Sequence, residues 1–294
     1  MLWALLTVAA SALQTARNAL QRGLTAEVGT LGATHARFLY GLPFAALVVV
    51  GLWAAGQPLQ APGGAMLGWA ALGGLAQIGA TALLLAAMQS SAFMLAVAYT
   101  KSEPVLVLVA AGLVVGETPT PGQSLAIVAA TAGVLLMAWP AGAARATRWW
   151  RPVVFGIGSG ALFAVSAVAF REAVLSLDRV GFLTAATTTL AIVLAIQTAV
   201  LSAWLAVREP GTLHRLIARP GAALPAGATG AAASACWFMA FALASAPLVR
   251  TLALVEIVFS HLVTQRVFAE TISPREGAGA ALLVLGIAGL FLGG

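Results

Sequence analysis

Charge and cysteine are both scarce in this chain. Charged residues make up 8% of its 294 residues and apolar residues 61%, which leaves too few polar side chains to cover a water-soluble domain. Cys236 is the only cysteine, so an internal disulfide and any cysteine-based zinc or iron–sulfur site are excluded. The composition therefore predicts an integral membrane protein.

Several catalytic motifs are absent as well. Lys101 is the only lysine, and it lacks the upstream glycines of a Walker sequence. The sequence contains no His-Glu-x-x-His, no Gly-x-Ser-x-Gly and no cluster of metal ligands. We therefore expect no enzyme, no metal and no cofactor. The net charge of +6 comes from arginines, which we place mainly in short loops and at helix ends, where they orient a chain in the bilayer rather than bind nucleic acid.

Long apolar runs dominate what is present. They are about 20 residues long, which fits membrane-spanning helices and not the shorter alternating strands of a barrel. The start of the chain lacks the positively charged segment of a signal peptide, so we interpret it as a span. We predict an all-α protein with ten transmembrane helices near residues 2–21, 31–55, 65–87, 92–115, 123–140, 153–175, 181–207, 222–244, 247–268 and 276–292.

The chain also contains a duplication of itself. Five residues of the fourth and fifth spans recur 153 positions downstream (256 − 103) in the ninth and tenth. The pairs are Glu103 and Glu256, Glu117 and Glu270, Thr118 and Thr271, Pro121 and Pro274, and Gly133 and Gly286. This divides the chain into repeats 1–144 and 145–294 of one integrated membrane domain. Because five spans is an odd number, the second repeat enters the bilayer inverted, an arrangement typical of transporters with a site at the midplane.

These repeated motifs resemble the drug/metabolite transporter superfamily, EamA type. The resemblance is carried by Ser102-Glu103-Pro104, by Gly116-Glu117-Thr118-Pro119-Thr120-Pro121, and by Ala36-Arg37-Phe38 at the start of the second span. It implies a ten-helix transporter, which could belong to the amino-acid exporter branch. Glu256 departs from the pattern because no proline follows it. The Arg-Phe pattern has no clear counterpart in the second repeat.

Ionisable residues inside the apolar runs are the first site hypotheses. Glu103 and Glu256 lie near the middle of their spans and either line a substrate pathway or brace the helices beside a break. Lys101 points about 200° away from Glu103 on a helix, so the two are not expected to pair. We favour a cavity-facing Lys101 that binds a substrate carboxylate, with an ion pair across helices as the alternative. Tyr99 and the mid-span Trp237 either line an amphiphilic pocket or pack between helices.

Polar stripes supply the remaining site hypotheses. Gln14 and Asn18 share one helix face with Arg17, and Gln77 forms a weaker stripe with Thr81. His261 could exchange protons with Glu256, but the angle between them on a helix favours a structural histidine. Glu117 and Glu270 stand at helix ends before a proline and are expected to cap or stabilise the turn.

Together these features predict a secondary transporter. We expect it to export small amphiphilic metabolites, most of all amino acids, by alternating access around a midplane cavity, with the lipid bilayer as its surroundings and a monomer as one option. Proton-coupled efflux of drugs or organic cations is the alternative, and an intramembrane enzyme or lipid-handling protein is the alternative of another class. Loop arginines place the odd loops in the cytoplasm and both termini outside a bacterial inner membrane.

Overall fold

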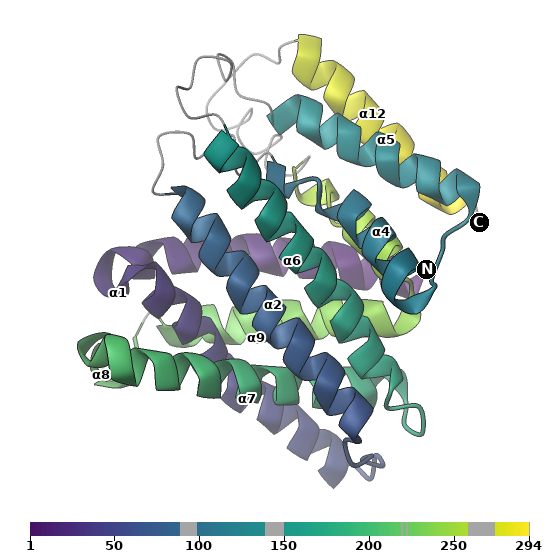
Figure 1. Cartoon of the computed structure of the whole chain (residues 1–294). Coiled ribbons are helices and arrows are strands. Elements are labelled where there is room, and N and C mark those ends of the chain that lie inside the picture. The colour runs from purple at the N-terminus through teal and green to yellow at the C-terminus, as the bar shows by residue number, and fades with distance from the viewer. Residues whose placement is uncertain (89–98, 139–149, 219, 222, 258–273, 294) are drawn as a thin grey trace. The chain divides into compact units, whose positions relative to one another are not determined.

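The computed structural model describes residues 1–88, 99–138, 150–218, 220–221, 223–257 and 274–293. Every regular element in these ranges is a helix (Figure 1), as the composition predicts. Six described helices are long and apolar enough to cross a membrane, and two shorter apolar helices, Glu103–Val115 and Pro121–Met137, accompany them. The described part of the chain is thus that of a multi-pass membrane protein. Its contacts divide it into two compact units, Met1–Leu75 with Ala169–Leu243 and Ala76–Val168 with Ala244–Gly294.

These units are not the two sequence repeats, because each takes helices from both halves of the chain. The repeat boundary near residue 144 lies outside the described residues, and the division into 1–144 and 145–294 stays a prediction. Most predicted spans agree with the observed helices to within three residues. These helices are α2 (Gly64–Met88), α5 (Pro121–Ala138), α6 (Trp150–Leu175), α7 (Phe182–Arg208), α9 (Ala223–Leu243) and α12 (Pro274–Leu292).

Unit 1 contains a helix where a loop was expected. The first two predicted spans form one element, α1 (Leu2–Ala54), which bends at Gly29 (Figure 1). Gly29 has φ 71° and ψ 174°, a conformation available almost only to glycine. The connection expected between residues 21 and 31 is therefore shorter than predicted, because the chain stays helical up to Gly29 and this glycine alone separates the two arms.

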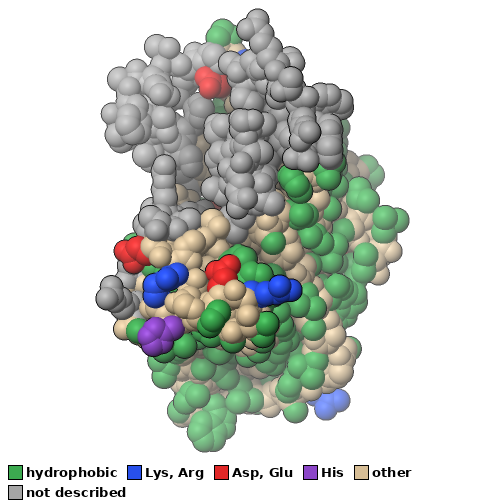
Figure 2. Space-filling model, turned by 60° about the vertical axis from the view of Figure 1, so that its left-hand side comes forward, with side chains coloured by type: hydrophobic (Ala, Val, Ile, Leu, Met, Phe, Trp, Pro, Cys, Tyr) green, Lys and Arg blue, Asp and Glu red, His purple; other side chains and the backbone are tan. Residues whose placement is uncertain are grey.

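A short amphipathic helix in unit 1, α8 (Pro210–Ala218), was not predicted. Thr212 and Leu216 are buried one turn apart, whereas His214 and Arg215 are exposed. Figure 2 brings this side of the molecule forward and shows acidic, basic and histidine side chains gathered among hydrophobic ones. The hydroxyl of Tyr40 in α1 donates a hydrogen bond of 2.7 Å to the Leu216 carbonyl, which fixes α8 to the rest of the unit.

Unit 2 contains two interrupted helices. Residues 99–100 are helical, a turn follows at Lys101 and Ser102, and α4 (Glu103–Val115) begins directly after it. The predicted span 92–115 is therefore not continuous. Pro104 explains the break, since a proline lacks the N–H that a helix interior requires but fits the first turn of a new helix.

The second repeat has the corresponding break. Helix α10 (Ala246–Leu252) ends in a turn at Ala253 and Leu254, after which residues 255–257 are again helical. This turn lies within one residue of the position that the 153-residue offset assigns to the first break. No proline follows Glu256, so the break does not depend on proline at this place.

Helices α5 and α12, which are equivalent in the duplication, pack closely and antiparallel in unit 2. A Cβ on Gly133 would lie 2.6 Å from the Gly279 carbonyl oxygen and 2.6 Å from the Leu283 nitrogen. A Cβ on Gly286 would likewise lie 2.8 Å from the Ala126 carbonyl oxygen and 2.5 Å from the Ala130 nitrogen. The two contacts are equivalent in the duplication, because Gly133 corresponds to Gly286 (133 + 153) and Gly279 corresponds to Ala126 (279 − 153). The two helices therefore meet about a local two-fold axis.

Candidate functional site

The two helix breaks of unit 2 bring four charged side chains together. The Lys101 ammonium Nζ lies 2.6 Å from Oε1 of Glu256. The Arg250 guanidinium, in the last turn of α10, forms an ion pair with Glu103 at the start of α4. The two charges of each sign cancel, so this group of four residues, which we call the break cluster, is electrically neutral.

Each ion pair joins one repeat to the other. Glu103 and Glu256 are equivalent in the duplication, and each binds a cation that comes from the opposite repeat. Lys101 stands two residues before Glu103, whereas Arg250 stands six residues before Glu256. The two cations are therefore not equivalent in the duplication, although the two glutamates are.

The cluster is largely withdrawn from solvent. The side chains of Lys101 and Glu256 are 27% and 19% exposed, and those of Arg250 and Glu103 are 19% and 12% exposed. A single ionised group in such a place would cost several kcal/mol, on the order of 3, unless a partner or water compensates it. Pairing therefore allows all four groups to remain ionised inside an apolar fold.

Neighbouring helices hold the first break in place. The Thr100 hydroxyl donates to the Gly156 carbonyl at 3.3 Å, and the Ser102 hydroxyl donates to the Tyr99 carbonyl at 2.7 Å. A Cβ on Gly160 of α6 would lie 3.3 Å from the Thr100 carbonyl oxygen. Gly160 therefore allows close packing against the break, whereas Ser159 contacts α2, where its hydroxyl donates to the Ala80 carbonyl at 2.9 Å.

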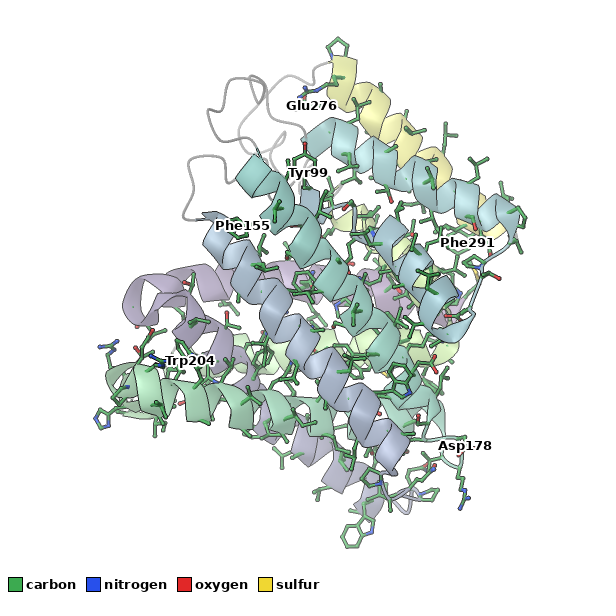
Figure 3. The ribbon with its side chains drawn as sticks, in the orientation of Figure 1. Tyr99, Phe155, Asp178, Trp204, Glu276 and Phe291 are labelled. Carbon is green, nitrogen blue, oxygen red and sulfur yellow. The ribbon has the colours of Figure 1, made fainter. Side chains whose placement is uncertain are left out.

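The other predicted site residues are divided between the units. Tyr99, labelled in Figure 3, directly precedes the break and is half-buried in unit 2. Gln77 is also half-buried in unit 2, and its carbonyl accepts a hydrogen bond of 2.8 Å from Thr81. Gln14 and Trp237 belong to unit 1, where Gln14 is half-buried and Trp237 is 7% exposed and stacks on Phe241 at 6.3 Å between ring centroids.

His261 and Glu270 lie outside the described residues. The side chain of Asn18 is likewise not described. Glu117 follows Gly116, which ends α4 with φ 70°, and the Glu117 N–H donates to the Ala111 carbonyl at 3.1 Å. Glu117 thus stands at a helix end, where we placed it. The sequence did not reveal the cap of the next helix, in which Thr120 and Gln123 exchange two hydrogen bonds of 3.2 Å.

Sequence reasoning also missed Arg250. Its signal was available, because it is an arginine inside an apolar stretch and lies one and a half turns before Glu256. Arg17 and Arg37 of unit 1 were noticed only as members of sequence patterns. Among the described residues, no group of three or more His, Cys, Asp or Glu side chains could hold a metal ion.

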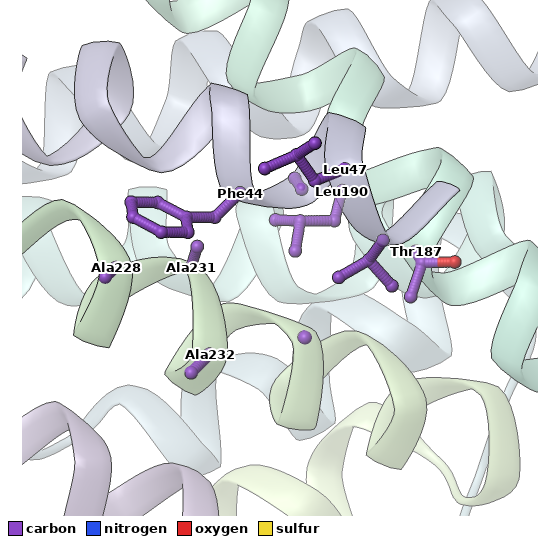
Figure 4. A pocket seen from close by; sticks show the side chains of 10 residues that line it. Phe44, Leu47, Thr187, Leu190, Ala228, Ala231 and Ala232 are labelled. Atoms are coloured by element: carbon purple, nitrogen blue, oxygen red, sulfur yellow. The ribbon is translucent and has the colours of Figure 1, made fainter. Parts of the chain in front are cut away.

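Unit 1 also contains an apolar cavity of about 390 Å³. Figure 4 shows Phe44 and Leu47 of α1 and Leu190 of α7 facing a series of alanines on α9. Thr187 contributes a polar atom, but its hydroxyl already donates to the Leu183 carbonyl at 2.8 Å. The cavity therefore offers almost no polar group to a ligand.

Comparisons with known proteins agree with this architecture. One solved crystal structure, described only as that of a protein, is similar over 99% of this chain and 97% of its own, with a TM-score of 0.70 and 18% sequence identity. At that identity the likeness concerns the fold alone. No curated protein matches the chain. The model of the EamA-like transporter family matches residues 1–139, the part of the chain that contains the Glu-Pro and Gly-Glu-Thr motifs.

Proposed function

We propose that this protein is a secondary transporter that exports small amphiphilic metabolites, with amino acids as the expected class, by alternating access. The observation that carries the proposal is the break cluster, in which two carboxylates and two cations meet at the interruptions of duplicated helices. Interrupted helices at equivalent places in two repeats are typical of substrate sites in transporters. The expected surroundings are a bacterial inner membrane with the odd loops in the cytoplasm.

The charge balance of the cluster favours a zwitterion. If the pair of Lys101 and Glu256 opens, a substrate ammonium can bind the carboxylate while the substrate carboxylate binds the lysine, so neither buried charge is left unpaired. An organic cation would satisfy Glu256 alone and leave Lys101 without a partner, which costs roughly 3 kcal/mol or more in a buried place. Amino acids therefore suit the cluster better than the cations of a multidrug exporter.

The antiparallel contact of α5 and α12 supports alternating access. Equivalent helices that meet about a two-fold axis give two repeats of opposite orientation, and exchanging the conformations of such repeats opens a site to the other side. The energy source consistent with the sequence is an ion or substrate gradient, because the chain lacks a Walker sequence.

A transport assay with three related solutes tests the proposal. Proteoliposomes are loaded with leucine, with the amine that lacks its carboxylate, or with the acid that lacks its amino group, and efflux is measured. We expect leucine to leave at least about 10-fold faster than either analogue, because a factor of ten needs only about 1.4 kcal/mol and the charge left unpaired costs more than that. Efflux of the amine alone would favour the cation exporter, and efflux of none would overturn the proposal.

Two variants connect the assay to the cluster. Lys101→Met should abolish most leucine efflux at unchanged protein yield, because the substrate carboxylate loses its cation. Arg179→Gln removes a positive charge from an exposed position of unit 1 and should leave the rate unchanged. A normal rate in Lys101→Met would exclude Lys101 from the pathway.

A further inference from the structure

The short helix α8 lies between two membrane-spanning helices of unit 1. Helix α7 ends at Arg208, so Glu209 alone connects it to α8, and the next span, α9, begins at Ala223. Both α7 and α9 are long and apolar enough to cross the bilayer. The residues that join two such helices have to lie where the spans emerge, at the level of the lipid headgroups. The order of the helices thus places α8 at the membrane surface.

Only a narrow face of α8 contacts the rest of unit 1. Thr212 and Leu216 are buried, and Leu213 packs beside them against the same apolar cluster. A Cβ on Gly32 of α1 would lie 2.9 Å from Cγ2 of Thr212, and the Tyr40 hydroxyl donates to the Leu216 carbonyl. These contacts fix which side of the helix faces the protein and which side faces outward.

The apolar side of α8 is wider than this contact. At about 100° per residue, Ile217 lies about 40° beyond Leu213 on the side away from Leu216, and it is 62% exposed. Val207 and Trp204 near the end of α7 are exposed as well, and Figure 3 labels Trp204. Apolar side chains at the edge of an amphipathic helix insert among lipid acyl chains, and tryptophan is enriched at the headgroup level. The exposed apolar surface of α7 thus continues onto α8.

The outward side of α8 is basic. His214 and Arg215 are exposed, as is Arg208 at the end of α7, and Figure 2 shows charged and histidine side chains on this side of the molecule. The stretch 208–219 contains three arginines and one glutamate, Glu209, which leaves an excess of two positive charges. A basic surface at the headgroup level attracts anionic lipids.

We propose that α8 is a binding surface for anionic phospholipids, with Ile217 among the acyl chains and with Arg208 and Arg215 on the lipid phosphates. The Arg215 guanidinium donates to the Thr212 hydroxyl at 3.0 Å, and this hydroxyl donates to the Glu209 carboxylate at 3.2 Å. That contact uses one of the five N–H groups of the guanidinium and leaves its planar fork available for a phosphate. The surface belongs to unit 1 and does not depend on the proposed transport.

Spin labels on the full-length protein test the depth of α8. Cys236→Ser removes the only cysteine, and Ile217→Cys or His214→Cys then carries the label at an exposed position. In nanodiscs of phosphatidylcholine and phosphatidylglycerol, the label at 217 should collide mainly with oxygen, which concentrates among acyl chains. The matched label at 214 should collide mainly with a water-soluble nickel chelate.

Two results of the labelling experiment would overturn the proposal. Equal access of the nickel chelate to both labels would mean that α8 lies in water. Spin–spin coupling between labels at 217 would mean that a second copy of this chain covers the apolar side instead of lipid.

Native mass spectrometry of the full-length protein in neutral detergent tests the headgroup preference. We expect phosphatidylglycerol to bind more tightly than phosphatidylcholine. Arg208→Gln and Arg215→Gln should each weaken the binding of phosphatidylglycerol by about 5-fold, the factor that one basic residue contributes near an anionic surface. The matched control is Arg179→Gln, another exposed arginine of unit 1. Equal affinity for the two lipids, or an equal loss in the control, would refute the assignment of α8 as the binding surface.

Discussion

Removing one member of the pair formed by Lys101 and Glu256 should lower the free energy of unfolding more than removing both. The two charged atoms lie 2.6 Å apart, and the side chains are only 27% and 19% exposed. Loss of one partner from a fully buried pair costs about 3–5 kcal/mol, because the other charge stays behind without compensation. With this partial exposure we expect about 2 kcal/mol for Lys101→Met and about 2 kcal/mol for Glu256→Gln.

The double variant should lose only about 1 kcal/mol, because no charge is left unpaired and two apolar or neutral groups replace the pair. Reversible unfolding in mixed micelles, followed by tryptophan fluorescence, gives the four free energies of unfolding that a double-mutant cycle needs. The control is Asp178→Asn, an exposed position where we expect a change below about 0.5 kcal/mol. If the double variant loses the full sum of the two single losses, the side chains do not interact in the folded protein and the break cluster is refuted.

Three further predictions concern packing and local hydrogen bonds. Gly286→Ala should lower the free energy of unfolding by about 1–2 kcal/mol, because the added Cβ would meet the backbone of α5. The control is Gly68→Ala, whose Cβ would meet nothing within 4 Å and which should raise the free energy of unfolding slightly in the same assay. Thr120→Ala should cost about 1 kcal/mol by removing the cap of α5, and faster amide hydrogen exchange at the start of that helix would reveal it. Tyr40→Phe should cost about 1 kcal/mol and expose α8 to limited proteolysis, because the 2.7 Å hydrogen bond to Leu216 is lost; unchanged cleavage would contradict this role.

Most helices of this chain could be predicted from its sequence, because they depend on features local in the sequence: long apolar runs and the prolines and glycines between them. Breaks within a run were harder to predict. Pro104 indicated the first one, but no proline indicates the turn at Ala253 and Leu254. The bend at Gly29 was missed because one glycine between charged residues was interpreted as part of a loop.

The site was predicted only in part, and the reason is geometric. The duplication identified Glu103 and Glu256 as equivalent, and Lys101 was expected not to pair with Glu103, although the reason given, a continuous helix through both residues, does not hold. Neither argument gives the register between two helices that are far apart in sequence. That register decides that Lys101 meets Glu256 and Arg250 meets Glu103, and it can be seen only in the folded chain.

The exchanged ion pairs also bear on the history of the chain. Both copies have the glutamate, but each has its cation at a different place. The counterpart of Lys101 in the second copy is Leu254, and the counterpart of Arg250 in the first copy is Val97. What both copies preserve is a neutralised carboxylate, and not the residue that neutralises it. The two halves have thus become complementary rather than interchangeable, so that each now depends on the other for the charge on its own glutamate.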